Sequence, residues 1–553
     1  MGAQTIAAAL PQMAAQQPDA VALWLPSSLK AKPPVRYTPV TFRELNTQCE
    51  RTMRALHHVG VRQGAHVAVM VKPGLEFFSL TFALFQLGAL PVLIDPGIGL
   101  KALKSCLAEA QPEVFIGIPP AHLARVVLGW GKGSVRTTIS VGPSGFWAQH
   151  RLDQLIRKTA EHDLPEVTIK PEDRAAILFT SGSTGIPKGV IYEHRNFAAQ
   201  VRMIRDLYTI EPGEVDLPTF PLFALFSPAL GTTSVIPPMD FTRPAKVDPA
   251  VLVDAIDQHG VNTMFGSPAL LNTLSRWCAR RKHRLDGFKR VISAGAPVPA
   301  AVLQRMRDAL PDGADIVTPY GATETLPIAS IESREVLGET AASSQLGRGV
   351  CVGRVADDVE LWIAEVSDEV ITTEEALNSA LAEPGTIGEV CVASPAVTTG
   401  YFGRERATAL AKIARSDGSV IHRMGDLGWV DEQRRLWFCG RKSQRVRLAS
   451  GDRFTVAVEG VFNAHPGVHR SALVGIGDAG AQRAVLFVEP ERELSEPIGE
   501  QQLRAELLEL ARQHDQTRCV ETVLFHEPFP VDIRHNAKIG RERLAQLAAK
   551  ELA

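Results

Sequence analysis

The most constraining feature of the sequence is a stretch rich in Gly, Ser and Thr at residues 180–189, which reads TSGSTGIPKG. An apolar run at 175–179 precedes it and a β-prone run at 190–192 follows, so it is predicted to be a loop between two strands. Glycines let a backbone approach a ligand closely, and consecutive free N–H groups can form a concavity that binds anions. With its hydroxyls and one lysine, the loop is predicted to hold polyphosphate through Thr180, Ser181, Gly182, Ser183, Thr184, Gly185 and Lys188.

The loop is not of the Walker A type. That motif places Gly directly before Lys, Ser or Thr directly after it, and then a helix. Here Pro187 precedes Lys188 and Gly189 follows. A flexible Ser/Gly linker is the plain alternative, but the proline, the lysine and the two bounding strands argue against it.

Length and composition narrow the class of protein. A chain of 553 residues exceeds one hydrophobic core, so several domains or subdomains are expected. The formal net charge of −2 gives no electrostatic reason to expect nucleic acid or an anionic membrane as a partner. Seven scattered cysteines without a Cys-x-x-Cys pair indicate reduced thiols in a cytoplasmic protein.

The longest uncharged run, 77–94, has about the length needed to cross a bilayer. It contains Gln86, Gly88 and Pro91 and ends in a β-prone triplet. A buried helix leading into a buried strand is therefore predicted, with no transmembrane segment.

Strands and helices alternate along the first part of the chain. β-prone runs at 21–25, 67–71, 91–94 and 114–118 are separated by helical patterns, which indicates an α/β fold with a largely parallel sheet covered by helices. Residues 131–170 are mixed in character and are predicted to be a surface connection.

The loop at 180–189 resembles the phosphate loop of the adenylate-forming superfamily, which includes acyl-CoA synthetases, peptide-synthetase adenylation domains and beetle luciferases. A second stretch, 320–324 (YGATE), resembles the Tyr-Gly-x-Thr-Glu motif of that superfamily. The Tyr320 ring can stack on adenine, Thr323 can donate to the α-phosphate, and Glu324 offers a hard oxygen ligand for Mg²⁺. The resemblance implies ATP and Mg²⁺ as cofactors, and it places Gly321 in the nucleotide site.

Further matches follow in the superfamily's order. Gly295, Ala296 and Pro297 match the segment that flanks adenine. Asp426 matches the aspartate that binds ribose, although Met424 replaces the usual Thr, and Arg441 would contact ribose or phosphate. Lys538 matches the lysine that bridges the substrate carboxylate and the α-phosphate, although Ala537 replaces the usual Gly. The residues that the resemblance makes catalytic are Lys538, Thr184 and Glu324.

The resemblance also implies a domain division. Residues 1–441 would form a large N-terminal domain of helix-covered, mostly parallel sheets with a small β-subdomain. Residues 442–553 would form a small mobile α+β domain that carries Lys538 and swings at a hinge on Ser443.

The acyl pocket of the superfamily falls on a Phe-rich stretch. The resemblance assigns Phe223, Phe226, Gly231 and Thr232 to it, whereas plain core is the usual fate of such phenylalanines. Ala224 stands where His is usual and Ser227 where Gly is usual, which indicates a different environment for the substrate.

The weakly polar pocket favours a hydrophobic carboxylic acid as substrate. Within the superfamily, the segments 220–238, 456–460 and 531–539 are similar to those of olefin-pathway β-lactone synthetases. That similarity implies activation of a long-chain 2-alkyl-3-hydroxyalkanoic acid as acyl-AMP, closure to a β-lactone, and a possible complex with the hydrolase and reductase of the pathway. A long-chain fatty acyl-CoA or acyl-AMP ligase, and a binding protein that has lost catalysis, stay open as alternatives.

Overall fold

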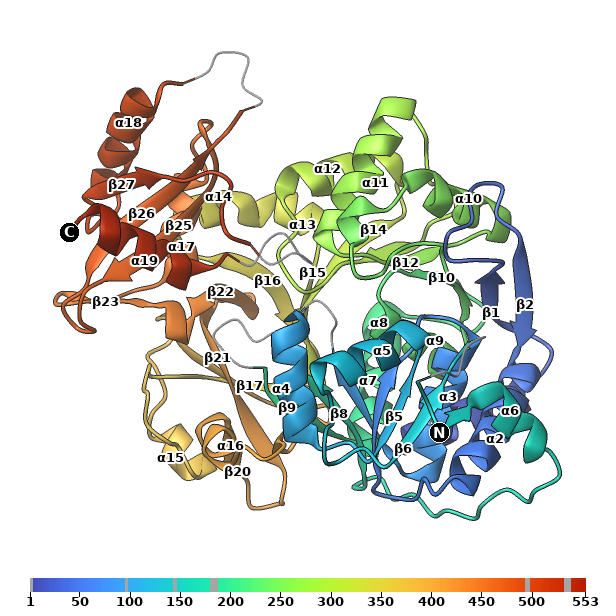
Figure 1. The fold of residues 1–553 in the computed structure, drawn as a ribbon. Coiled ribbons are helices and arrows are strands. Elements are labelled where there is room, and N and C mark those ends of the chain that lie inside the picture. The colour runs from blue at the N-terminus through green and yellow to red at the C-terminus, as the bar shows by residue number, and fades with distance from the viewer. Residues whose placement is uncertain (1–2, 95–97, 143–146, 180–186, 493–497, 532–538) are drawn as a thin grey trace.

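The computed structural model describes residues 3–94, 98–142, 147–179, 187–492, 498–531 and 539–553. It shows two large sheets with their covering helices and a smaller C-terminal α+β unit (Figure 1). The predicted α/β class is confirmed.

The first sheet has eight strands, five of whose seven pairings are parallel. Its order is β19 (Gly400–Tyr401), β9 (Gly189–Glu193), β8 (Arg174–Phe179), β4 (Leu90–Ile94), β3 (His66–Met70), β5 (Val114–Gly117), β6 (Thr137–Ser140) and β7 (His150–Arg151). The accompanying helices are α1 (Ile6–Gln16), α2 (Phe42–His58), α3 (Leu75–Leu87), α4 (Leu100–Ala110), α5 (Pro119–Leu128) and α6 (Leu152–Lys158).

The sequence predicted much of this sheet. Thr41 caps α2 in a capping box with Glu44, because each side chain accepts from the other residue's backbone N–H. Helix α3 is buried along almost its whole length and leads into β4, as the uncharged run indicated. No helix in the described part of the chain has the length and apolar character needed to traverse a bilayer.

One expectation for this sheet was wrong. The segment 131–170 is not only a surface connection, since it supplies β6, β7 and α6. Strand β6 is four residues long and β7 is two, which is too short for a hydrophobic period to stand out in the sequence.

The second sheet has fourteen strands. Its parallel part contains β1 (Val21–Pro26), β10 (Val215–Pro218), β11 (Thr233–Val235), β12 (Thr263–Phe265), β13 (Arg290–Ile292) and β14 (Asp315–Ala322), with β2 (Tyr37–Thr41) antiparallel at the edge. Its antiparallel part contains β15 (Thr325–Glu332), β16 (Val350–Val355), β17 (Glu360–Ala364), β18 (Gly388–Ala393), β20 (Lys412–Ala414), β21 (Val420–Val430) and β22 (Arg435–Arg441). The β-subdomain expected from the sequence is therefore a continuation of the second sheet.

Helices cover the second sheet and fill the space beside the first. They are α7 (His194–Tyr208), the short α8 (Pro221–Ala224) and α9 (Phe226–Leu230), then α10 (Pro249–His259), α11 (Pro268–Arg281), α12 (Ala300–Ala309), α13 (Ser333–Leu337), α14 (Glu339–Gln345), α15 (Glu374–Asn378) and α16 (Glu405–Ala411). Helices α10, α11 and α12 enclose a separate apolar core together with β12, β13 and β14.

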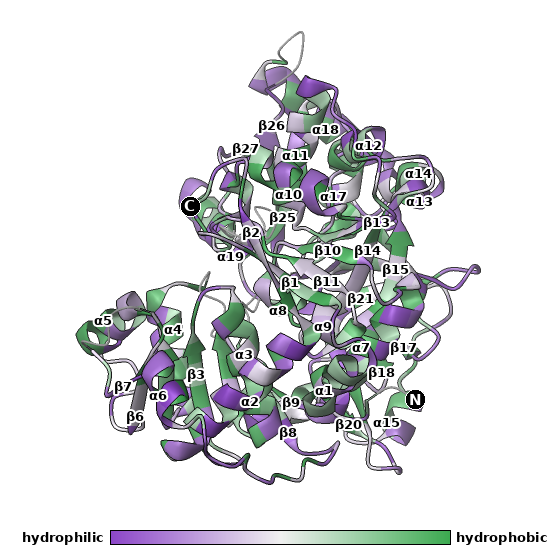
Figure 2. Ribbon diagram, turned by 90° about the vertical axis from the view of Figure 1, so that its right-hand side faces the viewer, coloured by the Kyte–Doolittle hydropathy of each residue, from purple (hydrophilic) through white to green (hydrophobic). Residues whose placement is uncertain are grey.

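The C-terminal unit follows the short 3-10 turn Lys442–Gln444. It contains β23 (Val446–Leu448), β24 (Gly451–Arg453), β25 (Val468–Ile476), β26 (Arg483–Pro490), β27 (Thr522–Phe525), α17 (Thr455–Phe462), α18 (Glu500–Gln513) and α19 (Arg541–Glu551). Its own apolar clusters lie on the two faces of its three-stranded sheet. Hydropathy colouring shows green strands inside each unit and purple stretches on the outer faces of the helices (Figure 2).

A charged network ties the turn Lys442–Gln444 to the second sheet. Glu389 of β18 accepts from Arg423 at 2.5 Å and from Lys442 Nζ at 2.9 Å, and the side chains of Arg423 and Glu389 are each 1% exposed. Arg423 and Lys442 also donate to the carbonyl of Ser367. Asp368 of the same segment binds Arg445 at 2.8 Å and Arg447 at 3.3 Å. We call the segment 367–369 the clamp.

Truncation of Glu389 is expected to destabilise the fold. Glu389→Ala leaves the Arg423 guanidinium buried without its carboxylate, which costs about 3–5 kcal/mol. Chemical denaturation should therefore show a clear fall in midpoint for this variant. The control is Asp368→Asn, whose carboxylate is half exposed and which should cost less than about 1 kcal/mol. Equal falls in the denaturation midpoint of the two variants would show that the buried Arg423–Glu389 pair stabilises the fold no more than the exposed contacts of Asp368 do.

Candidate active site

A cavity of about 2150 Å³ opens where the two sheets and the C-terminal unit meet. It gathers most of the residues that the sequence assigned to a site and that the structure describes, although they come from segments far apart in the chain. They are Lys188, Phe223, Phe226, Gly295, Ala296, Pro297, Tyr320, Gly321, Thr323, Glu324, Asp426 and Arg441.

Some assigned residues are not among these. Thr180, Ser181, Gly182, Ser183, Thr184 and Gly185, and also Lys538, lie outside the described residues. Thr232 lines a smaller neighbouring cavity together with Phe223 and Phe226. Gly231 lines neither cavity. It ends α9 with φ +80° and its carbonyl accepts from Gln17 at 2.9 Å, so these contacts give it a structural role.

Asp426 lines the cavity and is held by two side chains. It faces Arg441 across the ladder between β21 and β22, and its Oδ1 lies 2.7 Å from Arg441 Nη1. The Tyr320 hydroxyl of β14 donates to its Oδ2 at 2.6 Å. Burial raises the pKa of Asp426, while the Arg441 charge and the Tyr320 hydroxyl oppose that rise. The carboxylate is thereby fixed in place, and its oxygens can accept hydrogen bonds from neighbouring hydroxyls.

Gly321 is needed for the hairpin that presents Tyr320. A Cβ at this position would lie 2.8 Å from the Thr325 carbonyl and 2.7 Å from the Leu326 Cβ, closer than real contacts allow. The chain turns back tightly between β14 and β15, so Thr323 and Glu324 line the same cavity as Tyr320.

Glu324 lies in a polar cluster inside the cavity. Its Oε1 accepts from the Tyr401 hydroxyl at 2.6 Å, and its main-chain carbonyl accepts from the Thr398 N–H at 2.9 Å. Burial would raise the pKa of the carboxyl, but His422, the Tyr401 hydroxyl and Lys412 outweigh burial and hold that pKa below its ordinary value. Burial itself lowers the pKa of His422 to about 3 and that of Lys412 to about 7. At pH 7 the imidazole is then neutral and the Lys412 amine is only partly protonated, so the Tyr401 hydroxyl is the steadiest partner of the Glu324 carboxylate.

Tyrosine was the signal that sequence reasoning missed. The chain has five tyrosines, and three of them, Tyr192, Tyr320 and Tyr401, line this cavity. The Tyr192 hydroxyl donates to the Thr323 carbonyl, and Lys188 Nζ lies 4.7 Å from the centroid of the Tyr401 ring. Tyr192 lies three residues after the loop at 180–189, so its position could have marked it, whereas Tyr401 lies beside none of the motifs.

The C-terminal unit also lines the cavity. Arg541 of α19 lies on the cavity and pairs with Glu459 of α17 at 2.7 Å, and it donates to Gln444 at 3.3 Å. Glu459 also accepts from the Leu473 N–H at 2.8 Å. Position 541, three residues after Lys538, is thus anchored to α17.

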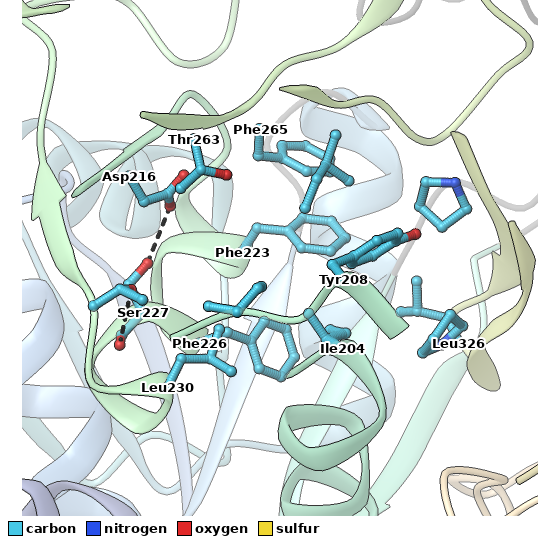
Figure 3. Close-up of a pocket in the computed structure, with 15 residues that line it drawn as sticks. Ile204, Tyr208, Asp216, Phe223, Phe226, Ser227, Leu230, Thr263, Phe265 and Leu326 are labelled. Atoms are coloured by element: carbon cyan, nitrogen blue, oxygen red, sulfur yellow. Dashed lines mark hydrogen bonds between the residues drawn. The ribbon is translucent and has the colours of Figure 1, made fainter. Parts of the chain in front are cut away.

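The smaller cavity is apolar and holds about 60 Å³ (Figure 3). Phe223 stacks on Phe265 with centroids 4.0 Å apart, and both line the large cavity as well. One carboxyl group, that of Asp216 in β10, faces the smaller cavity and accepts from Ser227 Oγ at 3.1 Å. Burial raises the pKa of Asp216 to about 7. Ala224, the other departure from the superfamily pattern, is buried in the large apolar core that includes the helices of the first sheet.

The model of the AMP-binding enzyme family matches residues 10–402. The chain belongs to this family. It is 48% identical over 557 aligned residues to an olefin beta-lactone synthetase of Stenotrophomonas maltophilia, covering 99% of this chain and 98% of that protein. It is 45% identical to the protein of that name from Xanthomonas campestris, again over 99% and 98% of the two chains.

Solved structures of more distant proteins share the fold. An amide bond synthetase from Marinactinospora thermotolerans superposes with a TM-score of 0.76 at 22% identity, covering 98% of this chain and 99% of that one. O-succinylbenzoate coenzyme A synthetase from Bacillus subtilis, in complex with ATP and magnesium, gives a TM-score of 0.74 at 20% identity over 97% and 98% of the two chains. Both likenesses confirm the arrangement of a large N-terminal sheet domain and a smaller C-terminal domain.

Replacement of Asp216 by Asn should change how stability depends on pH. The folded-state pKa of Asp216, about 7, lies above its ordinary value of 3.8, so the folded protein binds a proton that the unfolded chain releases. The wild type therefore loses stability as pH rises from about 4 to about 7, and Asp216→Asn does not undergo this loss. The melting temperature of the variant relative to wild type should be higher at pH about 8 than at pH about 5.

The control for this experiment is Asp358→Asn on the surface, where the side chain is 47% exposed and pairs with Arg202. Its melting temperature relative to wild type should be nearly the same at the two pH values. The assignment of Asp216 as a buried, proton-binding carboxyl would be contradicted if the melting temperature of Asp216→Asn relative to wild type did not increase with pH.

Proposed function

We propose that the protein activates a long-chain 2-alkyl-3-hydroxyalkanoic acid with ATP and then closes it to a β-lactone. Near-full-length identity of 45–48% to two olefin beta-lactone synthetases carries the proposal, because the aligned residues include the cavity lining from both the N-terminal and the C-terminal part of the chain. The Phe-rich lining of the cavity supports a hydrophobic acid.

The first step joins the acid to the nucleotide. A carboxylate oxygen attacks the α-phosphorus of ATP, the bond to the β-phosphate oxygen breaks, and acyl-AMP and pyrophosphate form. We assign ribose binding to Asp426 with Arg441, adenine stacking to Tyr320, and phosphate binding to Lys188, Thr323 and the loop 180–185. Fixed groups in a partly buried cavity act here by position and electrostatics, without a covalent enzyme intermediate.

Glu324 would hold Mg²⁺. Its carboxyl lines the cavity and its pKa is held low, so the group is an ionised oxygen ligand at neutral pH. Among the described residues there is no group of three or more His, Cys, Asp or Glu that could enclose a metal. That suits Mg²⁺, which takes one or two carboxylates and completes its shell with substrate phosphates and water. The ion would neutralise phosphate charge, while Tyr401 orients the carboxylate.

The second step is intramolecular. The 3-hydroxyl oxygen attacks the acyl carbon, the bond from that carbon to the AMP oxygen breaks, and the β-lactone, AMP and a proton are released. Lys538 is assigned the bridging of carboxylate and α-phosphate in the first step. We propose residues 1–441 and 442–553 as the two domains. The second domain would move about a hinge at Ser443. The protein would act in the cytoplasm. A complex with a hydrolase and a reductase of the same pathway is part of the proposal.

Isotope labelling of the acid tests both steps at once. A synthetic 2-alkyl-3-hydroxy acid with heavy oxygen in its carboxylate is incubated with ATP and Mg²⁺, with and without coenzyme A. One heavy oxygen should pass to AMP, and the organic product should be lighter than the acid by one water, whether or not coenzyme A is present. Analysis without heating avoids thermal decarboxylation of the lactone to an olefin.

The alternatives predict other products. A coenzyme A thioester, formed from this acid or from a plain fatty acid, would assign the protein to the fatty acyl-CoA ligases. Absence of pyrophosphate release with every acid would favour a binding protein that has lost catalysis.

Asp426→Asn tests the nucleotide assignment. The amide cannot pair with Arg441 as a carboxylate does, and the charge-assisted acceptor for ribose hydroxyls is lost, so KM for ATP should rise about tenfold or more. Steady-state pyrophosphate release with varied ATP measures the change. Asp358→Asn again serves as the control and should leave KM unchanged. An unaltered KM for ATP in Asp426→Asn would remove this residue from the nucleotide site.

A further inference from the structure

Large apolar side chains are exposed in one region of the first domain. Of the ten large hydrophobic residues with substantial exposure in the described part of the chain, five fall between positions 100 and 147. They are Leu100 (62% exposed), Leu123 (44%), Val126 (49%), Val127 (71%) and Trp147 (40%). Scattered exposed residues need no explanation, whereas a gathered set marks an interaction surface.

Helices α4 and α5 bring this set together. Both pack on one apolar cluster, through Leu103 and Leu107 of α4 and through Ala124 of α5. Lys104 Nζ of α4 lies 4.0 Å from the position that a Cβ on Gly129, at the end of α5, would occupy. Figure 2 shows α5 beside α4 at the outer edge of the molecule.

Helix α5 covers little of the sheet beneath it. His122 is its single buried residue, although the helix sequence is PPAHLARVVL and mostly apolar. Trp147 extends the exposed face, because its carbonyl accepts from Arg125 of α5 at 3.2 Å. Leu123, Val126 and Val127 of this helix are therefore left exposed on its outer face.

Charge around the helices is positive. Residues 98–142 contain five basic side chains, Lys101, Lys104, Arg125, Lys132 and Arg136, and two acidic ones, Glu109 and Glu113. This gives a local net charge of +3, whereas the whole chain has −2. Four of the five basic residues are exposed, and Glu109 is paired with Arg404 at 2.5 Å. The near-neutral total therefore conceals a basic, apolar face, which we call the α4–α5 face.

We propose that the α4–α5 face docks on an anionic lipid surface. Exposed aliphatic and Trp side chains beside lysines are the combination that binds at a membrane interface, where the apolar groups enter the headgroup region and the cations meet lipid phosphates. Charge complementarity selects an anionic bilayer over a neutral one. The docking is peripheral, and it would bring the enzyme to a reservoir of water-insoluble chains if the proposed function holds.

Vesicle flotation tests the proposal without any acid substrate, so the outcome is independent of the proposed function. Full-length protein is mixed with vesicles of phosphatidylcholine containing about one quarter phosphatidylglycerol, or with pure phosphatidylcholine, at low salt. Wild type should float with the anionic vesicles, float far less with the neutral ones, and detach as salt is raised, because exposed charges are screened.

The double variant Leu123→Glu with Val127→Glu should bind anionic vesicles at least about tenfold more weakly, since it removes two apolar contacts and adds two negative charges. Leu346→Glu is the matched control: Leu346 is 59% exposed but lies after α14 on the other sheet, and its variant should bind like wild type. Circular dichroism and melting temperature confirm that the variants are folded.

Three results would overturn the proposal. They are absence of wild-type flotation with anionic vesicles, equal flotation with neutral ones, and unchanged binding by the double variant. A change of oligomeric state in the double variant with unchanged vesicle binding would assign the face to a second copy of the chain instead.

Discussion

A buried carboxylate and its two partners fix the geometry on which the cavity depends. Asp426, Arg441 and Tyr320 come from three strands of one sheet, and Asp426 and Arg441 meet because they are paired in register. A one-residue slip would turn these side chains to the opposite face of the sheet and leave a charge buried without its counter-ion. The ion pair and the register thus support each other, and β14 is held against them by the Tyr320 hydroxyl. The walls that carry Glu324 and Gly295 are positioned as a result.

The motifs predicted much of this arrangement. Tyr320 and Asp426 were assigned to one nucleotide site although 106 positions separate them, and the structure joins them by a hydrogen bond. Short buried strands such as β4 and β8, and the capped helix α2, could also be predicted, because periodicity and capping are local properties.

What the sequence could not predict depends on contacts between distant segments. All six residues of β18 are buried, and Glu389 is accommodated there only because Arg423 and Lys442 reach it. The same limit applies to Tyr401, whose hydroxyl finds Glu324 across 77 positions. No local pattern records such a partner. The strands β6 and β7 were missed for a local reason, because each is too short to show a hydrophobic pattern.

The Phe-rich part of the cavity departs at two positions from the pattern that is usual in the superfamily. Ser227, where the superfamily usually has Gly, supplies the hydroxyl that meets Asp216 inside an otherwise apolar pocket. Ala224, where His is usual, lies in the core and leaves that position without a polar group. At these two positions the chain therefore gains a polar contact at Ser227 and lacks a polar side chain at Ala224.

The clamp at 367–369 has a consequence for the modularity of the chain. The Ser367 carbonyl binds Lys442, and Asp368 binds Arg445 and Arg447, so this segment of the N-terminal part and the first residues of the C-terminal part are matched to each other. A chimera that exchanges the C-terminal domain at position 441 would separate these partners and leave cations of the new junction facing an unrelated loop. Recombination between relatives should therefore succeed when the clamp and the C-terminal domain are inherited together, and the unit of inheritance in this chain is discontinuous in sequence.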